Sequence, residues 1–394
     1  MKKIIGLAIL ATLGIATAPF ASVNEVKAQT PAAAQGACTD DSKAAWYADF
    51  TKNRNVDNVK AYDAGKKYLT ACPTEEGPIP TYLKKWVAAY EMEARHLKLN
   101  EYLVQKKYAE TLTLAKEILT TEPEYLPATI YLGYGGYLLA VTTKNDSGSA
   151  EAVSYAKKAI AAIESGKTLE NWAPFKSKDD ALGYLYYAAG FLQRTSNPTD
   201  GLAAFIKAAQ FESDIKKNAN TYALIAGAYE ADYARQSTDY EAKYKGKDET
   251  PESKLAVANI NQVVDRIIDA LARAVSVAGT DAAAQASKTA WLGRLTELYK
   301  FRKGSDAGLT DMIASGMSKP LPPVPTPLTT LPDTPAATTT PSATGSMNGG
   351  SSATTPSNAA ATGNGAASTT TVGPTANSTK SVAKPKTRNN HRRP

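Results

Sequence analysis

Apolar residues recur at helical spacing through most of residues 29–319, and this periodicity limits what the chain can fold into. In residues 152–163 and 255–275, apolar side chains fall mainly three or four positions apart and trace one stripe along a helix. Sustained alternation of β-branched and polar residues, which is typical of strands, does not occur in this span. The helical stretches are separated by Pro73, Pro123, Pro127, Pro174 and Pro198. The sequence therefore predicts an all-α body.

Small and aromatic residues also recur at set spacings within this body. The clearest pattern is Tyr222-x-x-Ile225-Ala226-x-x-Tyr229, and Gly201-x-x-x-Phe205-x-x-Ala208 has the spacing of a partner helix. Further matches are Leu132-Gly133 followed by Ala152, Ala156 and Ala159; Tyr108, Leu112, Ala115, Ile118 and Pro123; and Ala61 with Pro73, behind Trp46 and Phe50. These positions resemble the tetratricopeptide repeat (TPR), a helix–turn–helix unit.

The resemblance implies a TPR-like α-solenoid over residues 40–319, in which each hairpin buries its apolar face against the next hairpin. The expected units are 40–73, 81–123, 126–164, 180–213, 218–279 and 287–317. Their lengths depart from the family's repeat. Extra residues enter near 141–150 and 235–252, and the second insertion is expected to lengthen helices or to form a protruding loop. An irregular helical bundle without stacked repeats is the alternative.

The N-terminus has the pattern of a bacterial-type secretory signal peptide. Lys2 and Lys3 precede an apolar run from Ile4 to Ala18, which is shorter than the roughly 20 residues that cross a bilayer. Val26-Lys27-Ala28 is a cleavage pattern, so residues 1–28 are the predicted signal peptide and 29–39 a short segment before the body. We therefore expect an exported protein, periplasmic or extracellular, with no membrane span after the signal is removed.

The basic character of the chain is confined to its ends. Its formal charge is +7, but residues 1–28 hold three lysines against one glutamate, and residues 320–394 hold six basic side chains against Asp333. The body between them is neutral, which argues against nucleic-acid binding. Residues 320–394 are rich in Pro, Thr, Ala and Ser and lack aromatic residues, so we expect a disordered tail. Its basic end is either a solvated linker or a tether to an anionic envelope polymer.

The only cysteines, Cys38 and Cys72, fall at the open end of the first predicted hairpin, whose helices are expected at 40–52 and 56–71. An exported protein meets an oxidising environment, where such a pair usually forms a disulfide. In the chain-entropy model, closing a loop of roughly 35 residues stabilises the fold by about 4 kcal/mol. Two unpaired cysteines are the alternative.

Sequence patterns for catalysis are absent. The chain has no phosphate-binding glycine loop, nucleophile elbow, zinc-binding His-Glu-x-x-His or acidic calcium loop. Its two histidines exclude a multi-histidine metal site, and His96 is expected to point into solvent. Asp179 and Asp180 begin a helix, where capping explains them, and the Gly133–Gly136 cluster is expected to allow close helix packing. We therefore predict a non-enzymatic protein without cofactor or metal.

In the TPR family, the first helix of each unit lines a concave groove that binds peptides. The resemblance carries this role to Tyr134, Tyr137, Tyr186, Arg194, Glu230 and Lys300. Tyr and Arg are favoured in binding hot spots. The alternative for each tyrosine is that its ring packs between neighbouring hairpins and only its hydroxyl meets water.

These observations predict a protein–protein interaction scaffold of the cell envelope. Two other classes remain open: a periplasmic ligand- or glycan-binding protein, and a structural protein that anchors to the envelope through its basic tail. A pocket lined by Trp86 or Trp172 with convergent polar groups would indicate the ligand binder. Loss of attachment on deletion of residues 375–394 would indicate the anchor.

Overall fold

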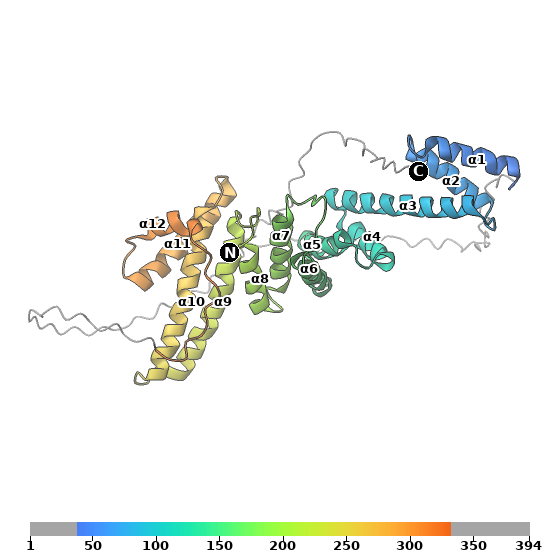
Figure 1. Cartoon of the computed structure of the whole chain (residues 1–394). Helices are drawn as coiled ribbons and strands as arrows, with labels where there is room; N and C mark the ends of the chain where they lie inside the picture. The colour runs from blue at the N-terminus through green and yellow to red at the C-terminus, as the bar shows by residue number, and fades with distance from the viewer. Residues whose placement is uncertain (1–37, 332–394) are drawn as a thin grey trace, which may run out of the picture. The chain divides into compact units, whose positions relative to one another are not determined.

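The computed structural model describes residues 38–331, and within this range every regular element is a helix (Figure 1). Twelve α-helices and one 3-10 helix are present there, with no strand. The prediction of an all-α body is confirmed. The signal peptide predicted at 1–28, the rest of the segment before Cys38, and the tail beyond Leu331 with its basic end lie outside the described residues.

In chain order the helices are α1 (Asp40–Asn53), α2 (Asn58–Ala71), α3 (Pro78–Val104), α4 (Tyr108–Thr121), α5 (Leu126–Thr143), α6 (Ser149–Glu164), α7 (Lys178–Gln193), α8 (Pro198–Ala208), α9 (Ala219–Tyr244), α10 (Pro251–Ser276), α11 (Ala282–Lys303), α12 (Leu309–Ser315) and the 3-10 helix η1 (Gly316–Ser318).

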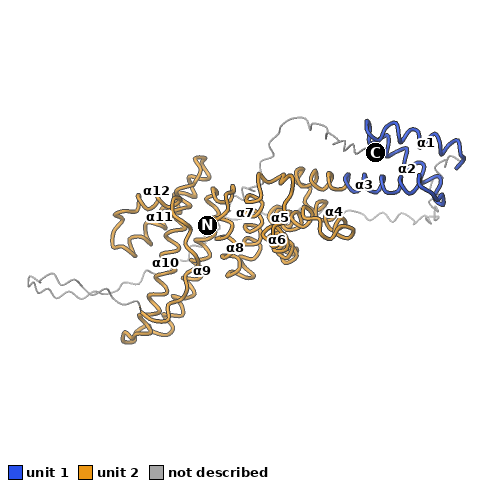
Figure 2. The backbone as a smooth tube through the Cα atoms, viewed as in Figure 1, with its two compact units in different colours: residues 1–94 blue, residues 95–394 orange. Residues whose placement is uncertain are grey.

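The chain divides into two compact units, and the division falls inside helix α3, after Ala94 (Figure 2). In unit 1, helices α1 and α2 pack as a hairpin. Their start positions follow from capping. Thr39 and Ser42 form a reciprocal capping box at α1, and the Asp57 carboxylate accepts the Lys60 N–H at α2. Phe50 is fully buried between them and the first part of α3.

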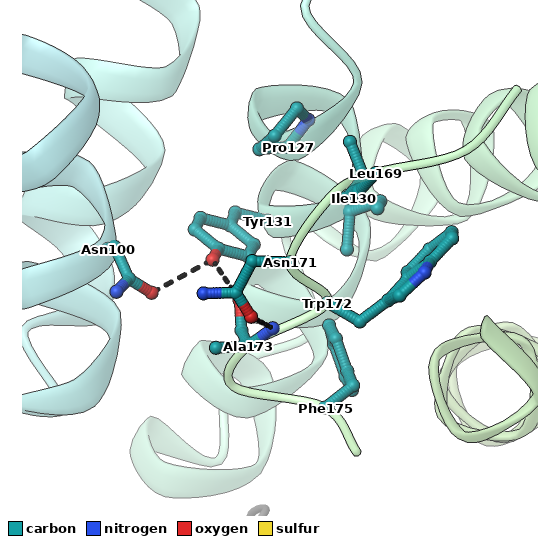
Figure 3. Close-up of a pocket in the computed structure, with 9 residues that line it drawn as sticks. All are labelled: Asn100, Pro127, Ile130, Tyr131, Leu169, Asn171, Trp172, Ala173 and Phe175. Carbon is teal, nitrogen blue, oxygen red and sulfur yellow. Dashed lines mark hydrogen bonds between the residues drawn. The ribbon is translucent and has the colours of Figure 1, made fainter. Parts of the chain in front are cut away.

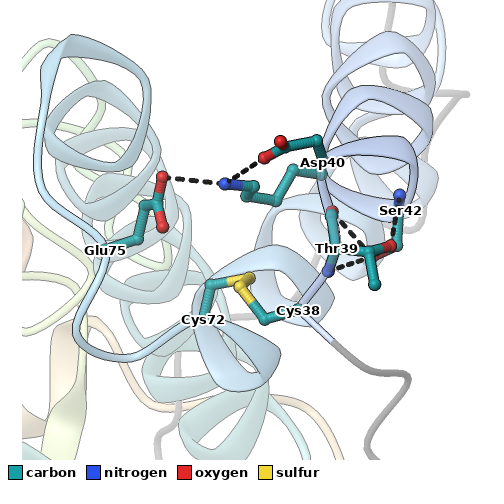
Figure 4. The surroundings of a disulfide bond; sticks show 7 residues. Cys38, Thr39, Asp40, Ser42, Cys72 and Glu75 are labelled. Atoms are coloured by element: carbon teal, nitrogen blue, oxygen red, sulfur yellow. Dashed lines mark hydrogen bonds and ion pairs between the residues drawn. A yellow bond between two sulfur atoms is a disulfide. The ribbon is translucent and has the colours of Figure 1, made fainter.

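A disulfide between Cys38 and Cys72 closes the open end of this hairpin (Figure 4). The two Cα atoms lie 5.4 Å apart, which confirms the predicted pairing. Near this end of the hairpin, the Lys43 ammonium lies 2.8 Å from an Asp40 oxygen and 3.1 Å from a Glu75 oxygen. Hydrogen bonding to Asp40 and then to Glu75 raises the Lys43 pKa. The start of α1 is therefore held to the end of α2 by one covalent bond and one ion-pair cluster.

In unit 2, helices pack in consecutive pairs: α5 with α6, α7 with α8, and α9 with α10. Neighbouring pairs are also in contact, because α6 packs on α7, α8 on α9 and α10 on α11. In addition, α5 contacts α7 directly, so the first helices of two successive pairs are neighbours. One continuous hydrophobic core runs through these contacts from Leu99 to Leu309.

Small residues set the close approach of α5 and α6, as the sequence predicts. A Cβ atom added to Gly133 would lie 2.7 Å from the Ala156 backbone, and one added to Gly136 would lie 2.5 Å from the Ala152 methyl group. Real Cβ atoms do not come so close to other atoms, so these glycines are required for the observed distance between the helices. The glycine cluster has a packing role.

The insertion near 235–252 lengthens helices. Helices α9 and α10 each contain 26 residues, and only residues 245–250 connect them. Thr250 caps α10 through a capping box with Ser253. The insertion therefore extends the hairpin by several turns, one of the two outcomes expected from the sequence.

The first part of the predicted tail is held against the body, so the expectation that disorder begins at Pro320 is wrong for residues 320–331. The extended segment, residues 319–331, leaves η1 without helical structure and runs along α10 (Figure 1). Side chains of α10 donate hydrogen bonds to its carbonyl groups at Lys319, Pro320, Pro323 and Leu328. Composition alone missed this because the partners lie far away in the sequence.

Candidate functional site

Two of the predicted groove residues, Tyr134 and Tyr137 of α5, are buried. Their exposed fractions are 1% and 5%, and burial raises both pKa values. The Tyr134 ring centroid lies 5.4 Å from that of Tyr184, and Tyr137 packs edge-on against Tyr187 at 5.9 Å. These two side chains line no exposed groove.

The composition of α5 contains the signal for this burial. The helix has no charged residue between Leu126 and Thr143 and is apolar around its circumference. A helix with this pattern belongs in a core, because it has no polar face to present to water. The uniform apolar composition of α5 is therefore the feature that indicates where Tyr134 and Tyr137 lie.

Two further predicted groove residues, Tyr186 and Arg194, lie on helix α7 and reach solvent. Between Ala181 and Gln193 only Tyr186 and Phe191 are not fully buried, and the exposed Arg194 follows directly. We call these three residues the α7 strip. The Arg194 guanidinium carbon lies 3.8 Å from the Phe191 ring centroid, and its Nη1 donates to the Phe191 carbonyl. Phe191 is not among the residues predicted from the sequence, although its spacing of three residues from Arg194 places it on the same helix face.

The hydroxyl group of Tyr186 is held in place by a hydrogen bond. Its hydroxyl donates a 2.8 Å hydrogen bond to the Glu164 carboxylate, and its ring stacks on Phe211 at 5.7 Å. Partial burial, followed by this hydrogen bond, raises its pKa to about 12. The ring is therefore held in one orientation with part of its surface exposed, which is the arrangement expected of a preorganised binding residue.

The last two candidates are engaged in separate ion pairs. Glu230 of α9 lies 2.8 Å from Arg294 of α11, and Lys300 lies 3.0 Å from Asp306. Both pairs are partly exposed to solvent, where such pairs contribute little to stability. The structure therefore places Tyr186 and Arg194 on one helix and gives Glu230 and Lys300 local structural partners.

A pocket of about 150 Å³ opens between α3, α5 and the loop before α7 (Figure 3). We call it the Trp172 pocket. It is lined by Asn100, Pro127, Ile130, Tyr131, Leu169, Asn171, Trp172, Ala173 and Phe175.

Two asparagine side chains are oriented at this pocket by hydrogen bonds. The Tyr131 hydroxyl lies 2.9 Å from Asn100 Oδ1 and 3.0 Å from the Ala173 carbonyl oxygen, and Asn171 Oδ1 accepts the Ala173 N–H at 2.9 Å. Because both amide oxygens are used, the NH₂ groups of Asn100 and Asn171 are left as donors, with no acceptor among the described residues. The pocket thus combines aromatic rings with two oriented donors.

The other candidate aromatic, Trp86, has a structural environment. Its ring lies 5.0 Å from Phe50 and stacks on Tyr90 at 5.6 Å, within the small core of unit 1.

His96 also differs from expectation: its side chain is only 19% exposed, stacks on Tyr125 at 3.8 Å and lies 3.0 Å from Glu122. The prediction that His96 points into solvent is wrong, because a neighbouring aromatic ring covers it.

The adjacent carboxylates at the start of α7 have different roles. Asp179 is exposed, whereas Asp180 is 1% exposed and accepts hydrogen bonds from the N–H groups of Lys176 and Asp214. The Asp180 N–H is capped in turn by Ser177. This carboxylate joins the start of α7 to the loop after α8, which supports the structural explanation of the pair.

No group of three or more His, Cys, Asp or Glu residues within 38–331 is arranged to hold a metal ion. No helix in that range is both long enough and apolar enough to cross a membrane. In comparisons with known proteins, no protein family, curated protein or solved structure matches the chain.

Proposed function

We propose that this chain is an exported, non-enzymatic scaffold that binds other proteins through a TPR-like α-solenoid. The packed helix pairs of unit 2, the contact between α5 and α7, and the glycines between α5 and α6 support the solenoid. The disulfide supports export, because such bonds persist in oxidising compartments. N-terminal sequencing of the secreted chain tests export, and we expect it to begin near Gln29.

The α7 strip is the observation that carries the binding proposal. Tyr186 and Phe191 are the residues of an otherwise buried helical stretch that reach solvent, and Arg194 lies beside Phe191. Aromatic and arginine side chains dominate binding hot spots, since they offer apolar area together with directed polar atoms. The side chains already hold fixed orientations, which reduces the entropy lost when a partner binds.

Affinity capture from an envelope extract tests this surface. The full mature chain is compared with a Tyr186→Ala/Arg194→Ala variant, and we expect the mature chain to retain a protein that the variant loses. The control is Arg235→Ala, which removes an exposed arginine on α9. Equal retention of every captured protein by all three chains would contradict the assignment of the α7 strip.

The Trp172 pocket favours a second candidate function, the binding of a small neutral ligand such as one sugar unit of a glycan. Sugar rings present an apolar face and hydroxyl groups, which match an aromatic wall and the amide donors of Asn100 and Asn171. Calorimetric titration with a panel of monosaccharides tests it. Binding that is weakened at least about tenfold by Asn171→Ala supports this function, whereas no heat with any sugar rejects it.

The third proposed function, anchoring to the envelope through the basic tail, concerns residues outside the described range. It predicts that deletion of residues 375–394 releases the protein from the envelope fraction.

A further inference from the structure

The extended segment is bound along α10 through its main chain. Arg273 donates to the carbonyl oxygens of Lys319 and Pro320 at 3.0 and 2.9 Å, and Arg266 donates to that of Pro323 at 2.9 Å. The Asn259 amide pairs with Leu328 in both directions, donating to its carbonyl at 3.2 Å and accepting its N–H at 2.7 Å. Each of these bonds reaches a main-chain atom of the segment.

The three α10 residues that make these bonds form a regular series, which we call the α10 ladder. Arg273, Arg266 and Asn259 are spaced by seven residues, so they share one helix face and lie roughly 10 Å apart. The extended segment passes them in the opposite direction. Eight residues of polyproline helix span about 25 Å, close to the roughly 21 Å between the ends of the ladder.

From Pro322 onward, the exposure pattern of the segment has the threefold period of a polyproline helix. Pro322, Pro325 and Leu328 are half-buried, whereas the residues between them are exposed; Leu321, which precedes them, packs against the core. A period of three is the repeat of the polyproline II conformation, in which every third side chain points the same way. One edge of this helix therefore lies on the body.

The α10 ladder binds main-chain atoms, so it recognises the extended conformation of a segment rather than its side chains. Proline has no N–H group, so its main chain offers only a carbonyl oxygen, and arginine supplies only donors. Asn259 adds one requirement, because its partner must be a residue with an N–H group. Arg273 is preorganised: its side chain is 3% exposed and Asp269 holds it at 2.7 Å.

We propose that the α10 ladder is a recognition site for extended proline-rich segments, which residues 319–328 occupy within the same chain and which a proline-rich segment of a partner protein occupies after displacing them. A second copy is disfavoured as occupant. Its own segment follows η1 directly and is already bound, so an exchange between copies creates no new contact. The site is separate from the α7 strip, so an experiment can contradict one of the two proposals and leave the other standing.

Displacement can be measured on the full mature chain. Pro322→Gly, Pro323→Gly and Pro325→Gly together remove the stiffness of the internal segment and leave the ladder intact. A fluorescent peptide of residues 319–331 should bind this variant at least about tenfold more tightly than the unaltered chain, because a tethered competitor acts at millimolar effective concentration. Leu328→Pro, which removes the N–H group that Asn259 accepts, provides a second route if the glycine variant loses its helical circular dichroism.

Three controls decide the outcome. Adding Arg266→Ala and Asn259→Ala to the glycine variant should abolish peptide binding, whereas adding Arg235→Ala should not. A peptide with glycine in place of its prolines should not bind. The proposal is overturned if the folded glycine variant binds no peptide, or if the ladder substitutions leave binding unchanged. A dimer of the unaltered chain that the peptide dissociates would identify a second copy as the occupant and overturn the assignment to a partner.

Discussion

Single glycines determine how closely the helices of unit 2 approach each other. Gly133 faces the Ala156 backbone with no room for a methyl group, since an added Cβ would lie 2.7 Å from it. We expect Gly133→Ala to lower the free energy of unfolding by about 1–3 kcal/mol, because α5 and α6 must move apart. Urea unfolding followed by circular dichroism measures this change.

Gly227 provides a matched control within a helix. An added Cβ there would meet nothing within 4 Å, and its helix α9 needs no unusual backbone angle at that position. Gly227→Ala should therefore raise the free energy of unfolding by about 0.5–1 kcal/mol, through helix propensity alone. If both substitutions shift stability in the same direction, the packing role of Gly133 is wrong.

Two buried tyrosines of α9 differ in how their hydroxyl groups are satisfied. The Tyr222 hydroxyl donates to the Lys216 carbonyl at 2.8 Å, whereas the buried Tyr229 hydroxyl has no hydrogen-bond partner among residues 38–331. We expect Tyr222→Phe to destabilise the protein by about 1 kcal/mol, and Tyr229→Phe to be neutral or stabilising. Equal losses in urea unfolding would indicate that the Tyr229 hydroxyl is satisfied in solution.

At the scale of elements, local signals predicted the helices well. The first hairpin was expected at 40–52 and 56–71 and is found at Asp40–Asn53 and Asn58–Ala71. Such boundaries depend on caps and turns, which involve residues close together in the sequence. The predicted closeness of α5 and α6 held for the same reason: small residues at helical spacing are a local property.

The extended segment and His96 were misplaced because their contacts are distant in the sequence. For Tyr134 and Tyr137, the apolar composition of α5 already indicates burial. The ladder on α10 meets the extended segment 46 to 69 residues later, and nothing in a proline-rich composition reveals that partner. His96 is covered by Tyr125 from the next helix pair. Tyr134 and Tyr137 lie in the core because neighbouring helices surround α5, whereas the repeat pattern specifies only one hairpin at a time.

The α1–α2 hairpin should depend on its disulfide. Unit 1 is small, and domains of this size bury too little apolar surface to be stable without additional links. Replacing both Cys38 and Cys72 with alanine removes a cross-link worth up to about 4 kcal/mol. We expect hydrogen exchange to accelerate in α1 and α2 and to stay unchanged in α5 to α8. Acceleration throughout the chain would show that the two units unfold as one.

At the scale of the whole molecule, buried tyrosines make the stability of unit 2 depend on pH. Tyr187, Tyr222 and Tyr229 are each less than a tenth exposed, and burial raises each pKa to about 12. In the unfolded chain a tyrosine ionises near pH 10. Above that pH the unfolded state releases protons that the folded state keeps, so the free energy of unfolding falls as pH rises. The stabilisation is fully present below about pH 10 and is lost between about pH 10 and pH 12.

We therefore expect cooperative alkaline unfolding in this window. Each of these tyrosines removes about 1 kcal/mol of stability near pH 11, and the core contains several, so unfolding should begin before any of them ionises in the folded state. The tyrosinate absorbance of the buried rings and the loss of helical circular dichroism should then share one midpoint. Tyr82→Phe is the control, because this ring is 39% exposed and belongs to unit 1, so its removal should leave the midpoint of unit 2 nearly unchanged. Full ionisation of the tyrosines near pH 10 with helical structure intact would show that water reaches the core of unit 2.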